Sequence, residues 1–570
     1  MPIENVTKKC GTVTSNPREI IDEFKDHWGG VMGSLYSSET DSYDPSERKQ
    51  KKLLDSIQVS LASAEQDRLS TRLSTTEMAE AIKHMRSSSS PGMDGLPAAF
   101  YQLDPETFGE CLKIVFEYQL ERGILLRSQR HSAITLLYKK GSRGDPGNYR
   151  PIALLCVDVK VLSKVLAYRL QRFLPKLIHQ DQKAFVRGRS MHHHIRHLTD
   201  IQDLVTHRGE EAYATFLDFE KAYDRVNWTS MFRVLEKMGV GKSFIDWVRL
   251  LYNNTKAQLM INGNITPSIT PQRGVKQGDP LSALLFLMTI EPLGNLLRQH
   301  EEHGIWINGT TVATGLFFAD DSILLSETPN GVLTQLELVQ VYCDGSGAKL
   351  NLSKSSLLSL NRTMPCPCIP NLTIMGPEDS VKYLGIPFGQ KPTHSMVIST
   401  LDKRFYDGFG VWFRRARTVR GRLLVAQTMI LSRLWHYTMH VDIPAATIRQ
   451  WQSMLNRFVL GRKHKKDSKH VHLLSKEFLY LRRQDGGLQV PFLVGRLKLQ
   501  RIQFLQQFAS DASTILPANW TTASTELLQL IQPPFGPHKP MDIFTIAPNR
   551  HGKMFQWKSM SSWWKHAFKM

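Results

Sequence analysis

The sequence has few cysteines: six in 570 residues, and none after Cys368. Cysteines this sparse are typical of a reducing compartment rather than of a disulfide-bonded scaffold. Cys366 and Cys368 flank a single proline, a spacing too short for the usual zinc-binding pair, and no matching pair follows them. We therefore expect no zinc knuckle and no metal at these cysteines.

Long apolar runs and acidic charge are also scarce. No apolar run approaches the roughly 18 residues needed to cross a bilayer, and residues 1–9 lack the apolar core of a secretion signal. The 52 Asp and Glu residues face 72 Lys and Arg residues, so the formal net charge is +20. This basic excess favours nucleic acid as partner, ahead of an anionic membrane surface. We expect no membrane partner and no secretion.

Two adjacent carboxylates interrupt the apolar segment 316–326, which reads Leu-Phe-Phe-Ala-Asp-Asp-Ser-Ile-Leu-Leu-Ser. Two short apolar runs split by Asp320 and Asp321 predict a buried β-hairpin with the acids at its tip. Adjacent carboxylates repel each other, so a cation is expected beside them, and Mg²⁺ prefers such oxygen ligands. An ordinary surface turn containing Asp is the alternative.

A second acidic segment lies upstream. Residues 215–226 read Thr-Phe-Leu-Asp-Phe-Glu-Lys-Ala-Tyr-Asp-Arg-Val, in which Asp218 ends a strand-like apolar run and a helical pattern follows. If this strand lies beside the hairpin, Asp218 faces Asp320. The acids then form a two-metal site for phosphoryl transfer.

These two segments together resemble the palm of a reverse transcriptase, in the variant of LINE-type (non-LTR) retrotransposons. The similarity extends from about Ser87 to about Gly389. It implies an α+β fold shaped as a right hand, with fingers, a palm built on a small antiparallel sheet and a helical thumb, followed here by a helical C-terminal extension. The implied activity is RNA-directed DNA polymerisation, in which a primer 3′-hydroxyl is extended with deoxynucleoside triphosphates (dNTPs) on an RNA template.

The resemblance also suggests domain limits. We expect an N-terminal extension over 1–86, fingers with part of the palm over 87–215, the palm over 216–390, the thumb over 391–465 and an extension of unknown role over 466–570. The reverse transcriptase domain itself would span about 120–390. Residues 75–86 predict a helix with Thr75 or Thr76 near its N-cap. The upstream segment leaves no room for the nuclease of many relatives, so we expect a fragment or a polymerase-only unit, with a separate endonuclease in trans as one option.

The resemblance implies a ligand set for the metals. Asp218 and Asp320 would bridge two Mg²⁺ ions, with Mn²⁺ as an alternative, while Asp321 would be a weaker ligand and the Phe219 carbonyl would add one oxygen. Lys354 is the candidate that protonates the departing pyrophosphate, with Lys349 second. A solvated surface lysine is the alternative at Lys354.

A nucleotide pocket is implied by two further segments and by Tyr223 of segment 215–226. Strand-like runs flank a basic, Gly-rich turn in 131–155 and predict a finger hairpin, and Gly-rich segment 271–286 matches the family's nucleotide-pocket motif. Tyr223 would pack under the sugar and exclude a 2′-hydroxyl, with a core aromatic as the alternative. The residues expected at the nucleotide are Lys139 or Lys140, Arg150, Tyr223, Gln277 and Gly278.

Other basic and turn segments are expected to contact nucleic acid. Arg187 and Arg189 surround Gly188 and could contact template phosphates, whereas the neighbouring His192, His193 and His194 are expected to be solvated. The remaining candidates are the primer-grip turn Tyr383, Leu384 and Gly385, and the thumb residues Arg414, Arg415 and Arg417. A basic run over 462–469 fits nucleic-acid binding, a nuclear-import address or a solvated loop. The family resemblance implies the nucleus, with a cytoplasmic ribonucleoprotein as the alternative.

Two other functions share part of this evidence. A group II intron maturase uses the same palm chemistry but usually carries Tyr-Ala-Asp-Asp, and no maturase-like segment is present. A nucleic-acid-binding remnant without polymerase activity is the other option. The intact acids favour an enzyme over a remnant.

Overall fold

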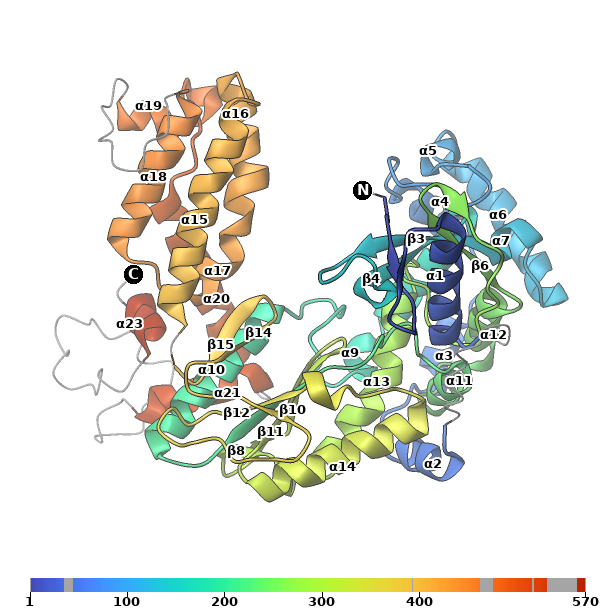
Figure 1. Ribbon diagram of the computed structural model, residues 1–570, viewed down its shortest axis with the longest axis horizontal. Coiled ribbons are helices and arrows are strands. Elements are labelled where there is room, and N and C mark those ends of the chain that lie inside the picture. The colour runs from blue at the N-terminus through green and yellow to red at the C-terminus, as the bar shows by residue number, and fades with distance from the viewer. Residues whose placement is uncertain are drawn as a thin grey trace.

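A computed structural model describes residues 2–34, 45–391, 393–461, 475–514, 517–530 and 561–568. The chain has the expected mixture of helices and sheets. The segments expected to form the thumb and the fingers, called thumb and fingers below, stand on opposite sides of the sheet expected in the palm (Figure 1). No helix in these ranges is both long enough and apolar enough to span a membrane.

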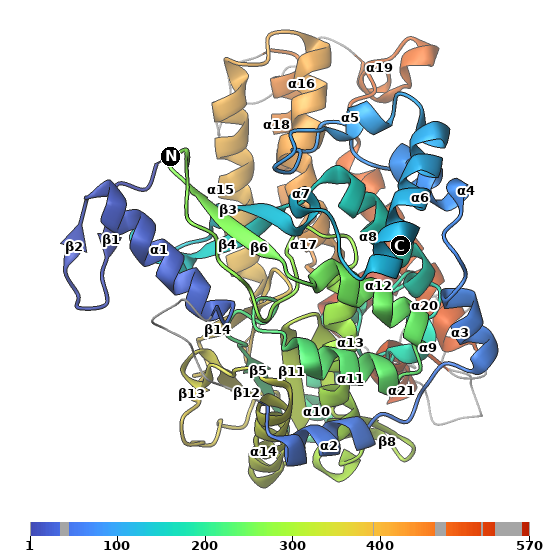
Figure 2. The same ribbon diagram turned by 90° about the vertical axis from the view of Figure 1, so that its right-hand side faces the viewer.

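The fingers are built on a four-stranded sheet in the order β4-β3-β6-β7. The predicted finger hairpin is present, because β3 pairs antiparallel with β4, and β6 pairs parallel with β3. Helix α1 lies beside these strands (Figure 2), and its Phe24 ring packs edge-on against Tyr149 of β4. The strands are β3 (His131–Tyr138), β4 (Tyr149–Leu154), β6 (Lys256–Ile261) and β7 (Asn264–Ile265).

Helices surround this sheet and connect it to the palm. The predicted helix near residue 75 forms as α4, but its N-cap is Ser74, whose hydroxyl accepts from the Glu77 amide in a capping box. The N-terminal strands are β1 (Val6–Thr7) and β2 (Val13–Thr14). The helices are α1 (Pro17–Val31), α2 (Glu47–Asp55), α3 (Ser63–Leu69), α4 (Thr75–Lys83), α5 (Ala98–Tyr101), α6 (Pro105–Arg122), α7 (Arg127–Arg130), α8 (Val157–Gln171), α9 (Leu174–Leu177), α11 (Trp228–Lys237) and α12 (Lys242–Tyr252).

The palm contains a five-stranded sheet in the order β10-β11-β5-β12-β13. Its pairs are antiparallel, as expected, except for the short parallel pair of β12 with β13. The strands are β5 (Tyr213–Leu217), β10 (Gly315–Phe318), β11 (Asp321–Ser326), β12 (Ser356–Ser359) and β13 (Thr373–Ile374). The two-stranded sheets beside it are β8 (Ile305–Asn308) with β9 (Thr311–Ala313), and β14 (Ser380–Tyr383) with β15 (Ile386–Gly389).

Both faces of the palm sheet are buried, which explains why its strands read as nearly continuous apolar runs. Ala214, Phe216 and Ile323 share one core cluster with apolar residues of α10 (Met191–Arg208). Leu217 and Leu324 belong to another cluster, which includes α13 (Ser282–Arg298) and α14 (Pro329–Ser346). The alternation of side chains along β5 therefore sorts its residues between two helical layers.

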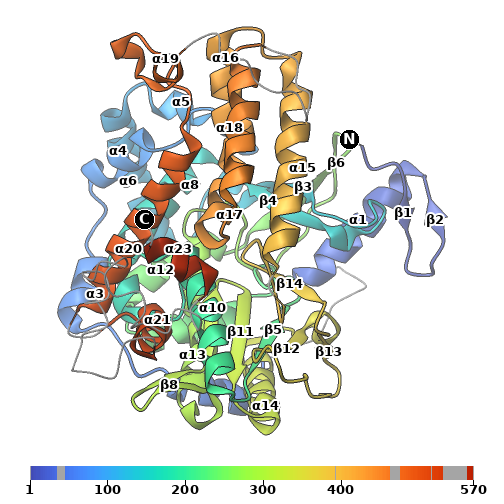
Figure 3. The same ribbon diagram turned by 90° about the vertical axis from the view of Figure 1, so that its left-hand side faces the viewer.

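The thumb is helical, as expected, and the C-terminal extension packs back onto it. The thumb helices are α15 (His394–Phe413), α16 (Val419–Val425), α17 (Trp435–His440) and α18 (Ala445–Val459). The extension contributes α19 (Lys476–Tyr480), α20 (Leu493–Ala512), α21 (Asn519–Leu530) and α23 (Ser562–Phe568). Helices α21 and α23 lie near α10, at the base of the thumb (Figure 3). The basic run 462–469 falls outside the described residues.

Candidate active site

The predicted acidic hairpin is present. Strands β10 and β11 pair from Gly315↔Leu324 to Phe318↔Asp321, so only Ala319 and Asp320 form the turn. Ala319 adopts φ +57°, a left-handed conformation that this tight turn requires. Its amide donates to the Gln182 side-chain oxygen at 3.0 Å. The main chain on either side of Asp320 is therefore fixed before any ligand binds.

Asp218 lies beside this hairpin because β5 pairs with β11. The last pair of the register is Leu217↔Ser322, so the next residues along the two strands, Asp218 and Asp321, lie at the same level. Side-chain alternation puts both on the face of the sheet that carries Phe216. The adjacency of the strand and the hairpin is confirmed. The register differs from the expected facing of Asp218 and Asp320, because Asp320 occupies the turn instead of a strand position.

The two hairpin carboxylates, Asp320 and Asp321, have raised pKa values. These two acids and Asp218 are exposed at the surface of the site, yet protein surrounds the two hairpin acids on several sides. This desolvation, followed by the charges of Asp320 and Asp218, raises the pKa of Asp321 to about 6. Desolvation also raises the pKa of Asp320, against the opposing effect of Lys139 and Arg150. The uncompensated negative charge is what a bound cation would neutralise.

Lys139 and Arg150 of the finger hairpin are positively charged side chains near these acids. Arg150 lies opposite Leu137 in the β3–β4 register, on the open face of the hairpin. Desolvation lowers the pKa of Lys139, and so does Arg150, while Asp320, Asp224 and Asp218 raise it. Lys139 is thus close enough to sense the palm acids. This interaction supports Lys139 as one of the two alternatives.

The carboxylate and carbonyl oxygens of the site are suitable ligands for a hard divalent cation. Asp218, Asp320 and Asp321 would hold it, and the Phe219 carbonyl follows directly on Asp218. In two other groups of described residues, the possible ligand atoms all lie within 4.8 Å of one another. The carboxylate oxygens of the three aspartates are not all this close. One or two carboxylates with phosphate oxygens are enough to bind Mg²⁺, so the donor set fits.

Tyr223 stands on the turn after β5 and is half-buried. Its ring stacks on Phe286 of α13, with centroids 4.2 Å apart and an angle of 12° between the planes. Desolvation, followed by Asp320, raises its pKa well above the ordinary value. One face of the ring is therefore fixed by Phe286, and the ring lies near Asp320. This placement is compatible with the expected contact to the sugar, which stays a prediction.

The Gly-rich segment packs against the base of the finger hairpin. Gly278 has φ +114°, and a Cβ there would lie 2.8 Å from the Ala153 carbonyl oxygen. Only glycine fits at this position. The Gln277 carbonyl accepts from the Ala153 amide at 2.7 Å. The segment is thus locked to β4, which carries Arg150.

Asp224 was missed by sequence analysis, although it directly follows Tyr223. The Gln277 amide nitrogen donates to both of its carboxylate oxygens, at 2.9 and 3.0 Å. Asp224 is buried, and this desolvation raises its pKa to about 7, against the effect of Lys221. The Gln277 nitrogen expected at the nucleotide is therefore engaged inside the protein.

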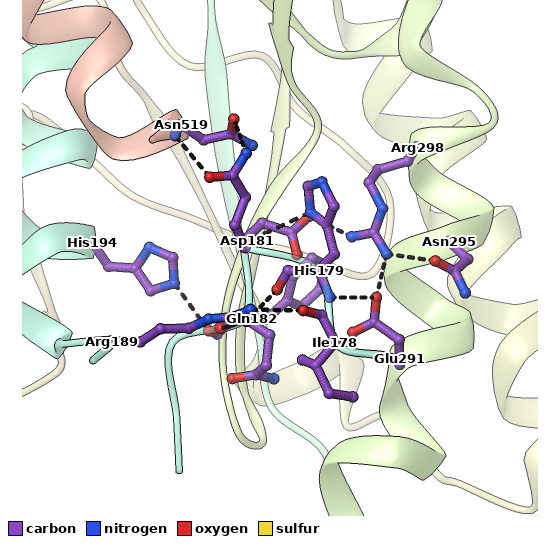
Figure 4. Close-up of polar contacts among 12 residues, drawn as sticks. Ile178, His179, Asp181, Gln182, Arg189, His194, Glu291, Asn295, Arg298 and Asn519 are labelled. Atoms are coloured by element: carbon purple, nitrogen blue, oxygen red, sulfur yellow. Dashed lines mark hydrogen bonds and ion pairs between the residues drawn. The ribbon is translucent and has the colours of Figure 1, made fainter. Parts of the chain in front are cut away.

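Arg189 corrects one prediction. Its guanidinium donates to four backbone carbonyls, those of Pro175, Ile178, His179 and Gln182, at 2.6 to 3.4 Å. Figure 4 shows Arg189 beside the last three of these residues. A side chain saturated in this way does not serve as a template-phosphate contact. Arg187, two residues earlier, is exposed and remains a candidate.

The segment that Arg189 fixes braces the catalytic hairpin. The Phe317 amide of β10 donates to the Asp181 carbonyl at 3.0 Å, and the Lys183 amide donates to the Phe317 carbonyl at 2.9 Å. The Asp181 carboxylate pairs with Arg298 of α13 at 2.5 Å (Figure 4). Arg298 and His179 hold the pKa of Asp181 well below its ordinary value, against the effect of burial. This brace, defined as residues 178–189, positions the turn that carries Asp320.

Two other predictions are wrong in part. Tyr383 of the predicted primer grip is buried in the palm core, so its ring cannot face a primer, and only the turn at Leu384 and Gly385 remains available. The three consecutive histidines are not solvated. His193 is buried and stacks on Trp520, and His194 is buried with Nε2 2.9 Å from the Phe317 carbonyl oxygen.

The remaining candidates are exposed but lie at different distances from the acids. Arg414, Arg415 and Arg417 are exposed in the turn between α15 and α16, at the end of the thumb farthest from the palm (Figure 1). Lys354 is exposed in a 3₁₀ turn, and its neighbour Asn351 donates its amide to the Asp218 carbonyl at 2.8 Å. Lys349 forms an ion pair with Glu220 at 3.3 Å, so Lys354 has the freer side chain of the two lysines.

Comparison with known proteins supports this geometry. The family model described as reverse transcriptase (RNA-dependent DNA polymerase) matches residues 137–388. Over these residues the chain is similar to the reverse transcriptase family. The match includes the finger hairpin from Leu137, the palm acids and strand β15, so the resemblance drawn from the motifs is confirmed.

The relatives are proteins of retrotransposable elements. The transposon TX1 uncharacterized 149 kDa protein of Xenopus laevis is 28% identical over 506 residues, 87% of this chain and 37% of that protein. The Pol polyprotein of the type-2 retrotransposable element R2DM of Drosophila melanogaster is 30% identical over 319 residues, 53% of this chain and 29% of its own length. The probable RNA-directed DNA polymerase from transposon BS of the same fly is 23% identical over 540 residues, 90% and 52% respectively. The chain thus spans about a third to a half of these relatives.

Proposed function

We propose that this chain is an RNA-directed DNA polymerase of the non-LTR retrotransposon kind. It extends a primer 3′-hydroxyl with dNTPs on an RNA template. The observation that carries the proposal is the meeting of β5 with the β10–β11 hairpin, which gathers Asp218, Asp320 and Asp321 within electrostatic range of Lys139 and Arg150. A cluster of acids faced by finger cations is what a nucleoside triphosphate with its metal ions requires.

The acids would hold two Mg²⁺ ions, with Mn²⁺ as an alternative. When bound, such ions lower the pKa of the 3′-hydroxyl and neutralise charge on the triphosphate. Lys139 and Arg150 bind the triphosphate oxygens, Arg150 through its planar fork. The primer 3′-hydroxyl gives up its proton to solvent, its oxygen bonds to the α-phosphorus, and the bond from the α-phosphorus to the oxygen of the departing pyrophosphate breaks. Lys354 then gives a proton to the departing pyrophosphate.

Nucleic acid lies along the basic surfaces between the fingers and the thumb. Arg187 and the thumb arginines Arg414, Arg415 and Arg417 contact backbone phosphates, which supply affinity without sequence preference. Because Arg414 to Arg417 lie at the tip of the thumb, they contact the duplex away from the primer end. We further propose that the protein acts in the nucleus.

A primer-extension assay tests this function. Wild-type protein should extend oligo(dT) on poly(rA), and Asp320→Asn should lower the rate at least about 100-fold, because the missing charge weakens metal binding in the site. RNA affinity should remain nearly unchanged, since the basic surfaces are intact. Asp67→Asn removes one exposed carboxylate on α3 and should retain full activity.

The two readouts separate an enzyme from a binding protein. Wild-type protein that binds poly(rA)·oligo(dT) and adds no nucleotide would be a remnant. Extension by Asp320→Asn at more than about a hundredth of the wild-type rate would contradict the assignment of the acids.

A further inference from the structure

Three histidines that lie far apart in the sequence meet where the palm contacts the thumb. They are His192 near the start of α10, and His436 and His440, four residues apart on α17. Each offers a ring nitrogen, and these atoms all lie within 4.8 Å of one another. His192 Nδ1 and His440 Nε2 form a hydrogen bond of 2.7 Å, so one of the two nitrogens carries a proton that a bound ion would replace. We propose that these histidines bind a divalent transition-metal ion, with Zn²⁺ as the expected species.

The spacing on α17 supports the proposal, because residues four apart project from the same face of a helix. Neutral imidazole is a preferred ligand for Zn²⁺, at about 2.0–2.1 Å in tetrahedral geometry. That geometry places two ligand nitrogens about 3.3 Å apart. His192 and His440 are somewhat closer than this, and a small rotation of either ring would admit the ion between them.

The environment of His436 independently supports metal binding by the three histidines. Metal-bound histidines usually direct their other ring nitrogen to a backbone carbonyl or a carboxylate, which fixes the ring. His436 Nε2 lies 2.8 Å from the Leu384 carbonyl oxygen, in the turn between β14 and β15. If Nε2 carries the proton, Nδ1 is the nitrogen that can bind an ion.

Access and charge at the site are also suitable. His440 lines a cavity of about 240 Å³ between α10, β15 and α23, and His192 and His436 are half-buried, so an ion with one water as fourth ligand can reach them. Arg196 is the nearest strong cation on α10, and its charge is offset by Asp200 and by Asp203 at 3.9 Å. Arg501 of α20 is the other strong cation near His440; Asp442 partly offsets its charge, and it donates to the Thr438 and Val441 carbonyls.

Such an ion would join α10 of the palm to α17 of the thumb, and through His436 it would also fix the Leu384 turn. It would act as a structural staple that sets the thumb's position. The site is separate from the acids at Asp218 and Asp320, so the proposal does not depend on the polymerase activity.

Metal binding to the full-length protein tests the proposal directly. Metal-free protein in excess Mg²⁺, which occupies the carboxylate site, is titrated with Zn²⁺ and separately with Co²⁺ as a spectroscopic probe. One equivalent should bind, and Co²⁺ should show the visible absorption of a tetrahedral nitrogen site. His192→Asn and His440→Gln should each weaken binding at least about 100-fold, since changes beyond the ligands alone already cost about 10–100-fold.

His207→Asn is the matched control, because His207 is exposed on the same helix as His192 and is outside the cluster. It should bind Zn²⁺ as the wild type does. Zn²⁺ should also raise the thermal midpoint of the wild type and of His207→Asn only. Absence of Zn²⁺ binding by the wild type, or equal binding by all variants, would overturn the proposal. The wild-type titration decides this even if a variant fails to fold.

Discussion

Tyr223 has two alternative roles, that of a residue excluding the 2′-hydroxyl of ribonucleotides and that of a core aromatic. Its ring stacks on Phe286 and so cannot retreat when a 2′-hydroxyl meets its edge. Tyr223→Ala should admit ribonucleotides roughly 10- to 200-fold more readily, if about 1–3 kcal/mol of clash is relieved. Single-nucleotide incorporation of rNTP against dNTP measures the ratio.

Tyr223→Ala should lower the efficiency of dNTP addition much less than it lowers the discrimination against rNTPs. Tyr118→Ala, which removes an exposed ring from α6, should leave the rNTP/dNTP ratio at the wild-type value. An unchanged ratio in Tyr223→Ala would make Tyr223 a packing residue and would mean that the 2′-hydroxyl is excluded elsewhere.

Asp224 makes stability depend on pH in a predictable direction. Its pKa of about 7 in the folded protein exceeds the ordinary value of 3.8, so the folded state holds an extra proton between these values. The free energy of unfolding should therefore fall as pH rises from about 4 to 7, by up to about 1.4 kcal/mol per pH unit from this group. Lys139, Lys221, Asp320 and Gln277 are the groups that face it.

Asp224→Asn removes this titration, so the variant should gain stability relative to the wild type as pH rises from 4 to 7.5. Thermal midpoints across this range give the difference, and Asp67→Asn serves as the exposed control. A difference that does not change with pH would mean that Asp224 is already ionised in the folded protein at pH 4.

At the scale of single residues, sequence analysis predicted which residues lie at the site better than it predicted what their side chains contact. Asp218, Asp320 and Tyr223 stand in motifs whose spacing predicts a strand and a hairpin, and both are present. The saturation of Arg189 by four carbonyls was not predictable, because an arginine in a basic loop is equally suited to phosphate. His436 and His440 carried a signal, their spacing of four, but the partner His192 lies 244 residues before His436.

At the scale of elements, the brace over residues 178–189 determines how the catalytic hairpin is held. Arg189→Ala should lower stability by several kcal/mol, because hydrogen bonds from a charged donor contribute about 1.5–3 kcal/mol each. Polymerase activity should fall with it, while the salt dependence of RNA binding stays the same. Thermal unfolding and binding at several salt concentrations give the two quantities.

Arg187→Ala is the matched variant for this element. Its stability should stay within about 0.5 kcal/mol of the wild type, and the slope of log K against log salt should fall by about 0.7–0.9, the value for one phosphate contact. If Arg189→Ala changed this slope and left the stability intact, Arg189 would instead be a nucleic-acid contact.

The pairing of the palm strands could be predicted from local pattern, but the expected register of Asp218 was one residue off, because Asp320 occupies the turn. The expected β-hairpin and the expected finger hairpin both form. The parallel pair of β12 and β13 and the brace beside β10 could not be predicted, since they depend on backbone hydrogen bonds that no side-chain pattern marks. The exposed arginines of the thumb were recognised, but their place at its tip depends on the length of α15.

At the scale of the whole molecule, the C-terminal helix α23 joins the thumb to the palm. Trp563 donates to the Met439 carbonyl of α17 at 2.8 Å, and Trp564 donates to Asp200 of α10 at 3.0 Å. Arg196 and Arg501 lie over the Trp563 ring, 4.9 and 4.5 Å from its centroid. Sequence analysis assigned no role to this region, because its partners are distant in the sequence, from Arg501 back to Arg196.

Trp563→Ala should therefore loosen the junction between thumb and palm without loosening the fingers. A buried Trp→Ala change costs about 3–5 kcal/mol, and the loss is confined to elements that touch the ring. Amide hydrogen exchange should become faster in α10, α17 and α20 and stay unchanged in β3 and β4, because exchange reports local opening. Trp306→Ala, at an exposed position of β8, should show none of these changes. Faster exchange in the finger strands as well would mean that the molecule unfolds as one unit, and that α23 stabilises all of it instead of the junction alone.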